Sequence, residues 1–241
     1  MKHTSRKPSN LSESLHHRLN SYAAAAGAAG VGLLALAQPA QAKIAYTRAH
    51  KQIAPNHTIP LDLNHDGRTD FSFHDSFTCT SFCEYIEGKL SVLPARLANE
   101  IVGHPGRSYA YASALSAGVR VGPKSPFSQG NKVMAFGGYD AGTQGPGYCS
   151  GPWQNVQHRY LGLEFSIEGK VHFGWARLTE TCSSKNGENT ALLTGYAYET
   201  IANKPIIAGR TKGPDVITLQ DPSLGHLARG ASAIPGWRRE Q

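Results

Sequence analysis

Apolar and polar residues alternate in short runs along most of the chain after residue 43, and Gly, Pro, Asn and Asp separate the runs. A period of two residues with turn residues between runs is typical of β-strands, and helical periodicity is almost absent. The sequence therefore predicts an all-β, mainly antiparallel domain. The expected strands are Lys43–Tyr46, Thr58–Leu61, Asp70–Phe73, Lys89–Val92, Lys132–Ala135, Tyr160–Ile167, Lys170–Leu178, Ala191–Glu199 and Pro205–Ala208.

Two turn signals join the strands between residues 160 and 208 into an antiparallel meander. Glu168-Gly169 predicts a tight hairpin turn, and Lys185–Asn189 predicts a longer hairpin loop. One face of the run 170–178 is large and apolar, with Val171, Phe173 and Trp175. The other face is mostly small, with His172, Gly174 and Ala176. This contrast suits a sheet that packs on another sheet.

We therefore expect a single jelly-roll-like β-sandwich over residues 43–212. Residues 93–131 predict a long surface excursion with a short helix near Pro94–Asn99, and residues 141–157 predict a Gly-rich loop. The strand pattern ends after Gly213, so residues 213–241 are expected to form a tail, disordered by default as termini usually are.

The N-terminal segment departs from the strand pattern. A basic cluster opens the chain, consisting of Lys2, Arg6, Lys7 and Arg18. The uncharged run Leu19–Ala42 follows, with a centre of only Ala, Gly, Val and Leu and an end in Ala40-Gln41-Ala42. This order is typical of a secretory signal peptide and predicts cleavage between Ala42 and Lys43.

A membrane anchor is the alternative for this segment. Its apolar centre is about 15 residues long, whereas a spanning helix needs roughly 20. A cleavage site follows at once, and the absence of an Arg-Arg pair in the segment favours the general secretory route over the twin-arginine route. We expect a periplasmic, secreted or cell-surface protein with no stable membrane span after cleavage of residues 1–42.

The charge of the chain argues against a nucleic-acid partner. The formal net charge is +7, and four of the basic residues lie in the predicted signal peptide. The remaining Lys and Arg residues are scattered along the sequence and form no basic stripe, which nucleic-acid binding would require.

All four cysteines lie after the predicted cleavage site: Cys79, Cys83, Cys149 and Cys182. An even number in an exported chain predicts two disulfides, for which three connectivities are possible. We favour Cys79–Cys83, because the two are close within one loop. We favour Cys149–Cys182, because these two cysteines lie in two Gly/Ser-rich loops that flank the same block of strands. A zinc site is the alternative, but no second pair has a matching spacing.

The segment between the second and third expected strands carries oxygen-bearing side chains at alternate positions. Calcium prefers six to eight oxygen ligands, and Gly67 permits the sharp turn that such a loop needs. If Asp62 is counted as position 1 of the loop, position 12 is Phe73, where an EF-hand has Glu, and the flanking segments are strand-like. The loop is therefore not an EF-hand, and it resembles the shorter loops of integrin-type and thrombospondin-type repeats. The candidate ligands are the side chains of Asp62, Asn64, Asp66 and Asp70 and the carbonyl of Arg68.

An Asx-rich turn without an ion is the alternative for this loop, because Asp, Asn and Gly are also the residues that turns prefer. The regular register of the four oxygen-bearing side chains favours calcium as a structural cofactor. Its affinity is expected on the order of 10⁻⁴–10⁻³ M, as in extracellular modules.

No catalytic residue is predicted. Gly147–Gly151 matches the nucleophile elbow of α/β-hydrolases, but Pro152 follows it where a helix would have to begin. The chain has no zinc-protease, P-loop or dinucleotide-binding motif. Glu164 and Glu168 could form a pair of carboxylates, but they lie on a strand and in its turn, so we expect them to be solvated hairpin residues. A glycosidase pair cannot be chosen from sequence alone.

Three aromatic residues surround the Gly-rich loop: Tyr148, Trp153 and Tyr160. Exposed aromatic rings on a β-sandwich could stack on sugar rings, which makes these residues candidates for ligand binding. The alternative is that Trp153 packs over the disulfide or the edge of the core. We favour this alternative, because single aromatic residues in loops usually bury their area.

Several segments resemble, in order, a group of exported bacterial proteins of unknown function, many of which end in a PEP-CTERM sorting signal. The resemblance extends loosely over residues 44–209 and implies association with the cell surface or extracellular matrix, without assigning a reaction. The segments are Leu61–Phe71, Tyr160–Phe165, Val171–Arg177, Leu193–Thr200 and Pro205–Gly209.

The C-terminus is similar to a sorting tail and also departs from one. Asp221–Gly225 and the terminal Trp237-Arg238-Arg239 fit the pattern, but His226, Arg229 and Pro235 interrupt the apolar stretch. One Arg at the centre of a bilayer costs about 2.5–3.5 kcal/mol on insertion scales, so this tail is not expected to span a membrane.

These observations favour a non-enzymatic surface or matrix-associated protein that binds a glycan or another surface component. The alternative is an exported hydrolase that acts on a polysaccharide. A cluster of carboxylates in a concave face of the sheet would favour the hydrolase, and a surface without clustered acids would favour the binding protein.

Overall fold

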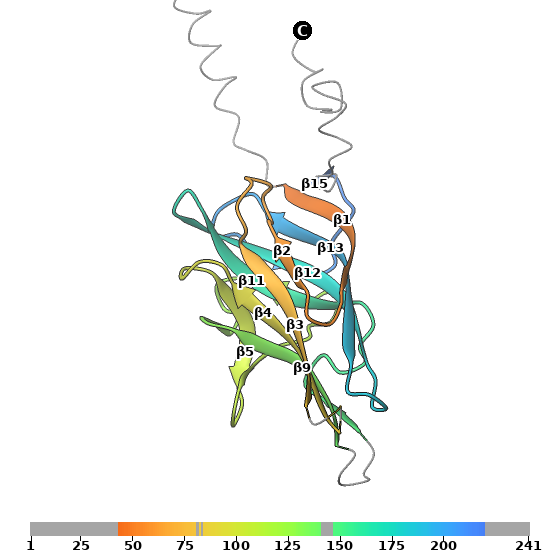
Figure 1. Cartoon of the computed structure of the whole chain (residues 1–241). Coiled ribbons are helices and arrows are strands. Elements are labelled where there is room, and N and C mark those ends of the chain that lie inside the picture. Colours follow the sequence, from red (N-terminus) through yellow and green to blue (C-terminus); the bar gives the residue numbers. More distant parts are fainter. Residues whose placement is uncertain (1–42, 81, 83, 141–146, 220–241) are drawn as a thin grey trace, which may run out of the picture. The chain divides into compact units, whose positions relative to one another are not determined.

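A computed structural model describes residues 43–80, 82, 84–140 and 147–219, and this part of the chain is almost entirely β-structure (Figure 1). The predicted signal peptide, Cys83 and most of the predicted tail lie outside the described residues. Within the described part, no helix is long and apolar enough to cross a membrane.

The strands follow one another with short connections, as the frequent turn residues of the sequence predict. They are β1 (Ile44–Ile53), β2 (Thr58–Leu61), β3 (Phe71–Thr80), β4 (Tyr85–Pro94), β5 (Glu100–Pro105), β6 (Ala110–Ala112), β7 (Arg120–Val121), β8 (Phe127–Ser128), β9 (Lys132–Asp140), β10 (Tyr148–Ser150), β11 (Arg159–Ile167), β12 (Lys170–Cys182), β13 (Asn189–Glu199), β14 (Ile206–Ile207) and β15 (Val216–Leu219).

Thirteen of these strands form one open, mostly antiparallel sheet, with the order β15-β1-β13-β12-β11-β5-β6-β9-β4-β3-β2. Strand β8 also pairs with β5, and β10 with β9, while β7 and β14 form a small separate sheet. Two pairs are parallel, β1 with β15 and β6 with β9. The predicted all-β, mainly antiparallel class is therefore confirmed, and the strands are joined into one continuous mixed sheet.

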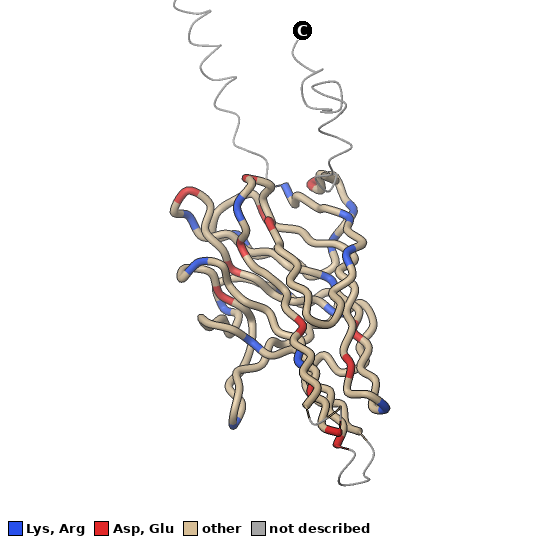
Figure 2. Tube along the Cα trace, viewed as in Figure 1, with Lys and Arg blue, Asp and Glu red and all other residues tan. Residues whose placement is uncertain are grey.

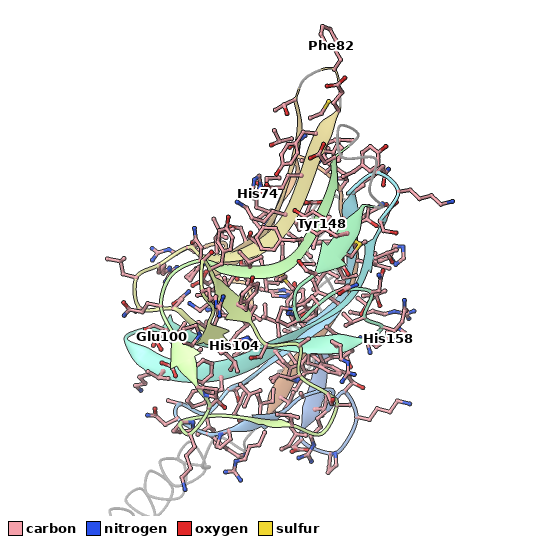
Figure 3. The ribbon with its side chains drawn as sticks, turned by 90° about the horizontal axis from the view of Figure 1, so that it is seen from below. His74, Phe82, Glu100, His104, Tyr148 and His158 are labelled. Atoms are coloured by element: carbon pink, nitrogen blue, oxygen red, sulfur yellow. A yellow bond between two sulfur atoms is a disulfide. The ribbon has the colours of Figure 1, made fainter. Side chains whose placement is uncertain are left out.

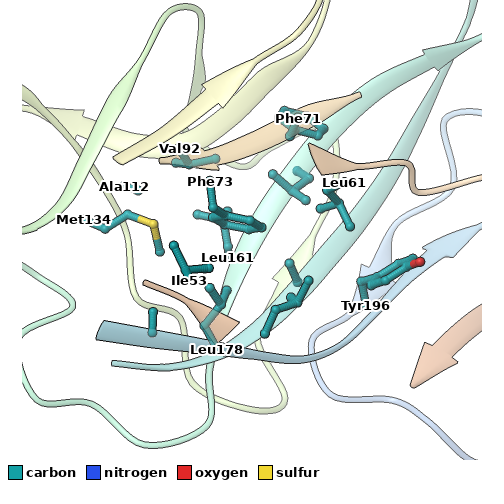
Figure 4. Packing of buried hydrophobic residues seen from close by; sticks show 14 of the residues in the cluster. Ile53, Leu61, Phe71, Phe73, Val92, Ala112, Met134, Leu161, Leu178 and Tyr196 are labelled. Atoms are coloured by element: carbon teal, nitrogen blue, oxygen red, sulfur yellow. The ribbon is translucent and has the colours of Figure 1, made fainter. Parts of the chain in front are cut away.

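The two arms of this sheet face each other around a main core. Strands β1, β13, β12 and β11 form one arm, and β9, β4, β3 and β2 form the other. Ile53 and Leu178 of the first arm are buried in the same cluster as Phe73 and Val92 of the second (Figure 4). Contacts of β13 with β4 and of β12 with β9 join the arms directly. Burial of this apolar surface is the main force that holds the fold together.

A second core covers the outer face of the first arm. Phe173 and Trp175 of β12 are buried there with Val121 and Ile206, which belong to the small sheet β7–β14. The large apolar face that was predicted on β12 therefore packs under this small sheet. The opposite face, with Ala176, points into the main core. Both faces of β12 are buried because two connecting segments supply an additional layer.

The turn predictions are confirmed. Strand β11 ends at Ile167 and β12 begins at Lys170, and the two residues between them, Glu168 and Gly169, have φ of 50° and 77°. Positive φ at both central positions is the geometry of a tight hairpin turn. The longer loop between β12 and β13 closes through hydrogen bonds between Ser183 and Glu188 and between Gly187 and Ser183.

Four sequence expectations differ from the structure. The Gly-rich loop expected at residues 141–157 contains the strand β10, which pairs with β9. The helix expected near Pro94–Asn99 is a turn, because β4 continues to Pro94 and β5 begins at Glu100, which leaves room for little more than one turn. The excursion expected at residues 93–131 instead contains four short strands. Val216–Leu219, which were placed in the tail, form β15 beside β1.

Candidate functional site

The predicted calcium loop connects β2 to β3, and its first carboxylate is directed at the loop backbone. Asp62 Oδ1 accepts the N–H of His65 at 2.7 Å and that of Asp66 at 3.3 Å, and Asp62 Oδ2 accepts the N–H of Gly67 at 2.8 Å. Asp66 Oδ1 accepts the N–H of Arg68 at 2.8 Å. These bonds fix a tight loop, in which Gly67 has φ of +81°.

Two further members of the predicted set lie deeper. Asp70 is buried, and its Oδ2 accepts the N–H of Leu63 at 2.9 Å. Burial raises the pKa of Asp70 to about 6, the Leu63 N–H opposes this shift, and the negative charges of Asp62 and Asp66 add to it. The buried Oδ1 of Asn64 has no hydrogen-bond partner.

The loop thus brings Asp62, Asp66 and Asp70 into electrostatic range of each other without gathering them into a ready cage. Within the described residues, no three His, Cys, Asp or Glu side chains are grouped so that they could hold a metal ion. The carboxylates of Asp62 and Asp66 serve the backbone instead, as in an Asx turn. The unpartnered oxygen of Asn64 is the feature of the loop that the turn alone does not explain.

His65 attaches this loop to the first arm of the sheet. Its Nε2 lies 3.0 Å from Thr47 Oγ1 on β1 and 3.1 Å from Tyr196 Oη on β13. His65 has φ of 61°, a conformation that costs energy for a residue with a side chain. The two hydroxyl contacts hold the ring in place and fix the loop against β1 and β13.

One predicted disulfide is present among the described residues. Cys149 of β10 is bonded to Cys182 at the end of β12, with a Cα–Cα distance of 6.0 Å. Since β10 pairs with β9, the bridge ties one arm of the sheet to the other. The other predicted bridge, Cys79–Cys83, includes Cys83, which lies outside the described residues.

The three aromatic residues proposed for ligand binding do not share a surface. Trp153 is fully buried in the main core and its Nε1 donates to the carbonyl of Ala112 at 3.1 Å, so the alternative favoured from the sequence holds. Tyr160 is buried in the second core, edge-on to Trp175. Tyr148 alone is exposed, on the outside of β10 (Figure 3).

A groove on the outer face of the second arm escaped the sequence analysis. It encloses about 350 Å³, within the usual range for small-ligand sites. Tyr109 borders it, and Lys89 Nζ lies 5.7 Å from the centre of the Tyr109 ring. The lining residues are His74, Ser76, Lys89, Ser91, Leu93, Tyr109, Ala110, Asn131, Lys132 and Val133.

This groove could have been anticipated from the strand period. His74 and Ser76 alternate with the buried Phe73 and Asp75, which places them on the outer face of β3. His74 is labelled in Figure 3. The described lining contains hydrogen-bonding groups and two lysines but no carboxylate. Tyr109 comes from the β5–β6 turn, a position that no periodicity of the sequence indicates.

A pair of carboxylates lies elsewhere, on the outer face of the first arm. Glu164 of β11 is directly opposite Glu100 of β5, and Figure 3 shows Glu100 on the same strand as His104. Burial raises the pKa of Glu164, and the charge of Glu100 raises it further. The sequence analysis considered Glu164 with Glu168, but Glu168 is exposed in the hairpin turn and Glu100 is the actual neighbour.

Two other acids are enclosed between the arms. Asp75 and Glu180 are fully buried, and burial raises the pKa of each to about 7. The Glu188 charge raises the pKa of Asp75 further. For Glu180, a hydrogen bond from the Asn155 N–H opposes the shift and the Asp75 charge adds to it. Strands β3 and β12 extend beyond their predicted ends at Phe73 and Leu178, so the sequence analysis placed neither acid in a strand.

No protein-family model matches the chain, and no curated protein or solved structure matches it either. Basic and acidic residues are scattered over the described part of the chain (Figure 2), so the function is inferred from the particular groups of residues described above.

Proposed function

We propose that the protein is exported and acts at the cell surface or in the extracellular matrix as a non-enzymatic binder of an anionic glycan. The observation that carries this proposal is the groove over β3, β4 and β9, which offers the Tyr109 ring, hydroxyl groups and the ammonium group of Lys89, and whose described lining has no carboxylate. The second lysine of the lining, Lys132, is buried and donates to the carbonyls of Gln129 and Gly130. Sugars are bound through such combinations of ring stacking and hydrogen bonds.

Export is supported by three observations. The sequence has a complete signal-peptide pattern, β1 begins at Ile44, two residues beyond the expected cleavage site, and the Cys149–Cys182 disulfide suits an oxidising compartment. The resemblance to surface proteins with a PEP-CTERM tail points in the same direction, and the two facing arms support a jelly-roll-like sandwich. Mass spectrometry of the native protein should find Lys43 at the N-terminus, and an intact Met1 would contradict export.

The glycan proposal is tested on the groove itself. We expect purified protein to be retained by an anionic polysaccharide column at low salt and released as salt rises, because lysine contacts are screened. Tyr109→Ala should weaken retention at least tenfold, since an aromatic stacking contact is removed. Tyr148→Ala is the matched control, because this ring is exposed to a similar degree and lies outside the groove. If both variants lost retention equally, or if the wild type were not retained, the groove would not be the glycan-binding site.

We also propose that the loop of residues 62–70 holds a structural calcium ion. The unpartnered Oδ1 of Asn64 and the concentration of negative charge around Asp70 support this proposal. Binding to the native state alone must raise the melting temperature, so millimolar calcium should stabilise the wild type and have a smaller effect on Asp62→Asn. If the loop is an Asx turn without an ion, calcium should shift the melting temperature of the wild type and of Asp62→Asn equally.

A hydrolase is the second candidate, and the opposed pair Glu100 and Glu164 favours it. Glycoside hydrolysis uses two carboxyl groups a few ångströms apart, one of them with a raised pKa. Release of reducing ends from the retained polysaccharide would reveal this activity, and Glu164→Gln and Glu100→Gln should each abolish it. If the polysaccharide remains intact after prolonged incubation with the wild type, the hydrolase is refuted and only the binding function remains.

A further inference from the structure

Polar residues replace apolar ones at one end of the main core. On β3, Asp75 follows Phe71 and Phe73 on the inward face. On β12, Glu180 follows Leu178 on the inward face, and on β13, Asn189 precedes Ala191 there. The three polar residues are at most 1% exposed, as deeply buried as the hydrocarbon beside them.

These three side chains converge from both arms. Asn189 pairs with Cys182 and Ala191 with Glu180, so Glu180 and Asn189 are diagonal neighbours on one face of adjacent strands. Asn189 Nδ2 reaches the opposite arm, within 2.9 Å of the point where a Cβ on Gly88 would stand. Asp75 is the diagonal neighbour of Gly88 across β3 and β4, and its charge raises the pKa of Glu180.

Glycines close this end of the core. A Cβ on Gly88 would stand 2.3 Å from the carbonyl oxygen of Gly187, and one on Gly137 would stand 2.5 Å from the same oxygen. The β12–β13 loop can therefore lie directly against β4 and β9 only because these positions carry no side chain. The nearby Cys149–Cys182 bridge holds the arms together. The enclosed polar space is thus shielded from solvent.

Most of the polar side-chain atoms in this space lack partners. Both oxygens of Asp75, Oε1 of Glu180, and both Oδ1 and Nδ2 of Asn189 have no hydrogen bond. No salt bridge within the described part of the chain reaches Asp75 or Glu180. Buried carboxylates with few donors and no counter-charge are strongly unfavourable unless a proton or a cation compensates them, and a bound cation would supply the missing positive charge.

One of the oxygens is already oriented. Glu180 Oε2 accepts the N–H of Asn155 at 2.7 Å, and Asn155 Oδ1 in turn accepts the N–H of Cys182 at 3.0 Å. This chain of bonds fixes the Glu180 carboxylate and leaves Oε1 available on the side without a donor. Outer hydrogen bonds of this kind orient the ligands of bound metal ions.

We propose that Asp75, Glu180 and Asn189 form an interior binding site for a hard divalent cation of the calcium type. The site offers four oxygens, two from Asp75 and one each from Glu180 and Asn189, and water completes the six to eight that calcium takes. The two carboxylates match the two charges of the ion. Asn189 Nδ2, which has no partner, would be available to donate to a coordinated water. None of these ligands belongs to the loop of residues 62–70.

The test compares the purified wild-type chain with Asp75→Asn, in chelator and in millimolar CaCl₂. The wild type should gain on the order of 5 °C in melting temperature when calcium is added. Asp75→Asn removes a buried charge, so it should melt at or above the wild type in chelator and below it in calcium. Equilibrium dialysis should show one fewer calcium ion bound per chain in the variant.

Two further variants separate the interior site from the loop. Glu180→Gln should lose the same single ion as Asp75→Asn, and it replaces Asp75→Asn if that variant fails to fold. Asp62→Asn acts on the loop and should leave the interior ion bound. If Asp75→Asn and Glu180→Gln both retain the wild-type number of ions and the wild-type calcium shift, the interior contains only protons and water, and the proposal is overturned.

Discussion

The two ends of the main core are built on the same strands and differ in chemistry. At one end, Phe73, Leu178 and Leu193 pack as hydrocarbon against each other, with no polar atom that needs a partner. Two to four residues further along the same three strands, Asp75, Glu180 and Asn189 occupy the equivalent inward positions. Both ends are equally shielded from water.

The comparison shows that burial alone does not tell how an interior is stabilised. At the apolar end, each side chain removed from water stabilises the folded state. At the polar end, each carboxylate removed from water destabilises the folded state, unless a proton or an ion compensates its charge. A substitution at the apolar end should therefore always destabilise the fold, while at the polar end the sign depends on what is bound.

The largest effect is expected at the apolar end. Phe73→Ala deletes a fully buried ring and leaves a cavity between the arms, which should lower the free energy of unfolding by about 3–5 kcal/mol. Urea denaturation measures it, with Asp75→Asn in chelator as the matched variant two residues along β3. If both variants were destabilised alike in chelator, the distinction between the two ends would fail.

The disulfide should contribute nearly as much, and it acts at the polar end. Cys149 and Cys182 are 33 residues apart, and opening a loop of this length should cost about 3–4 kcal/mol. Urea denaturation of Cys149→Ser/Cys182→Ser measures the loss. The double variant Cys79→Ser/Cys83→Ser is the control, because its predicted bridge would close a much shorter loop. A larger loss in the control would contradict this assignment.

The alternation of residues predicted the existence of all nine expected strands, because inward and outward positions differ in hydrophobicity wherever one face is buried. It failed at their ends. Strand β3 continues from Phe73 to Thr80, where Asp75 interrupts the apolar pattern, and β12 continues from Leu178 to Cys182 past Glu180. Polar residues at inward positions resemble the start of a loop, so the interior acids were missed for the same reason as the strand ends.

The candidate sites were predictable to different degrees. The 62–70 loop follows from local spacing, so its turn geometry is visible in the sequence. The groove, the Glu100–Glu164 pair and the interior acids each require strands that are distant in the chain to lie side by side. Only the sheet order brings such residues together, and no periodicity within a single strand indicates it.

A smaller effect is expected from the glycines that close the polar end. In Gly88→Ala, the new methyl group would collide with the Gly187 carbonyl and the Asn189 side chain, so the β12–β13 loop must move outward. Overpacking of this kind should cost about 1–3 kcal/mol. It should also speed exchange of calcium from the interior site, which stopped-flow chelation measures. Unchanged stability together with unchanged exchange would show that the loop is not closely packed there.

The smallest effect is expected for an acid that lies outside the main core. Burial and the Glu100 charge raise the pKa of Glu164 above its ordinary value of 4.5, so the folded state binds its proton more tightly than the unfolded state. The destabilisation is therefore absent at pH values below 4.5, grows as pH rises from 4.5 to the raised pKa, and is complete above it.

Glu164→Gln removes this titration. Its melting temperature should match that of the wild type near pH 4 and exceed it by a few degrees near pH 8. Glu168→Gln, in the exposed hairpin turn, serves as the control and should follow the wild type throughout. If the wild type instead gained stability relative to Glu164→Gln as pH rises, the Glu164 carboxylate would be held by a cation. The outer face of the sheet would then also contain an acid whose charge is compensated.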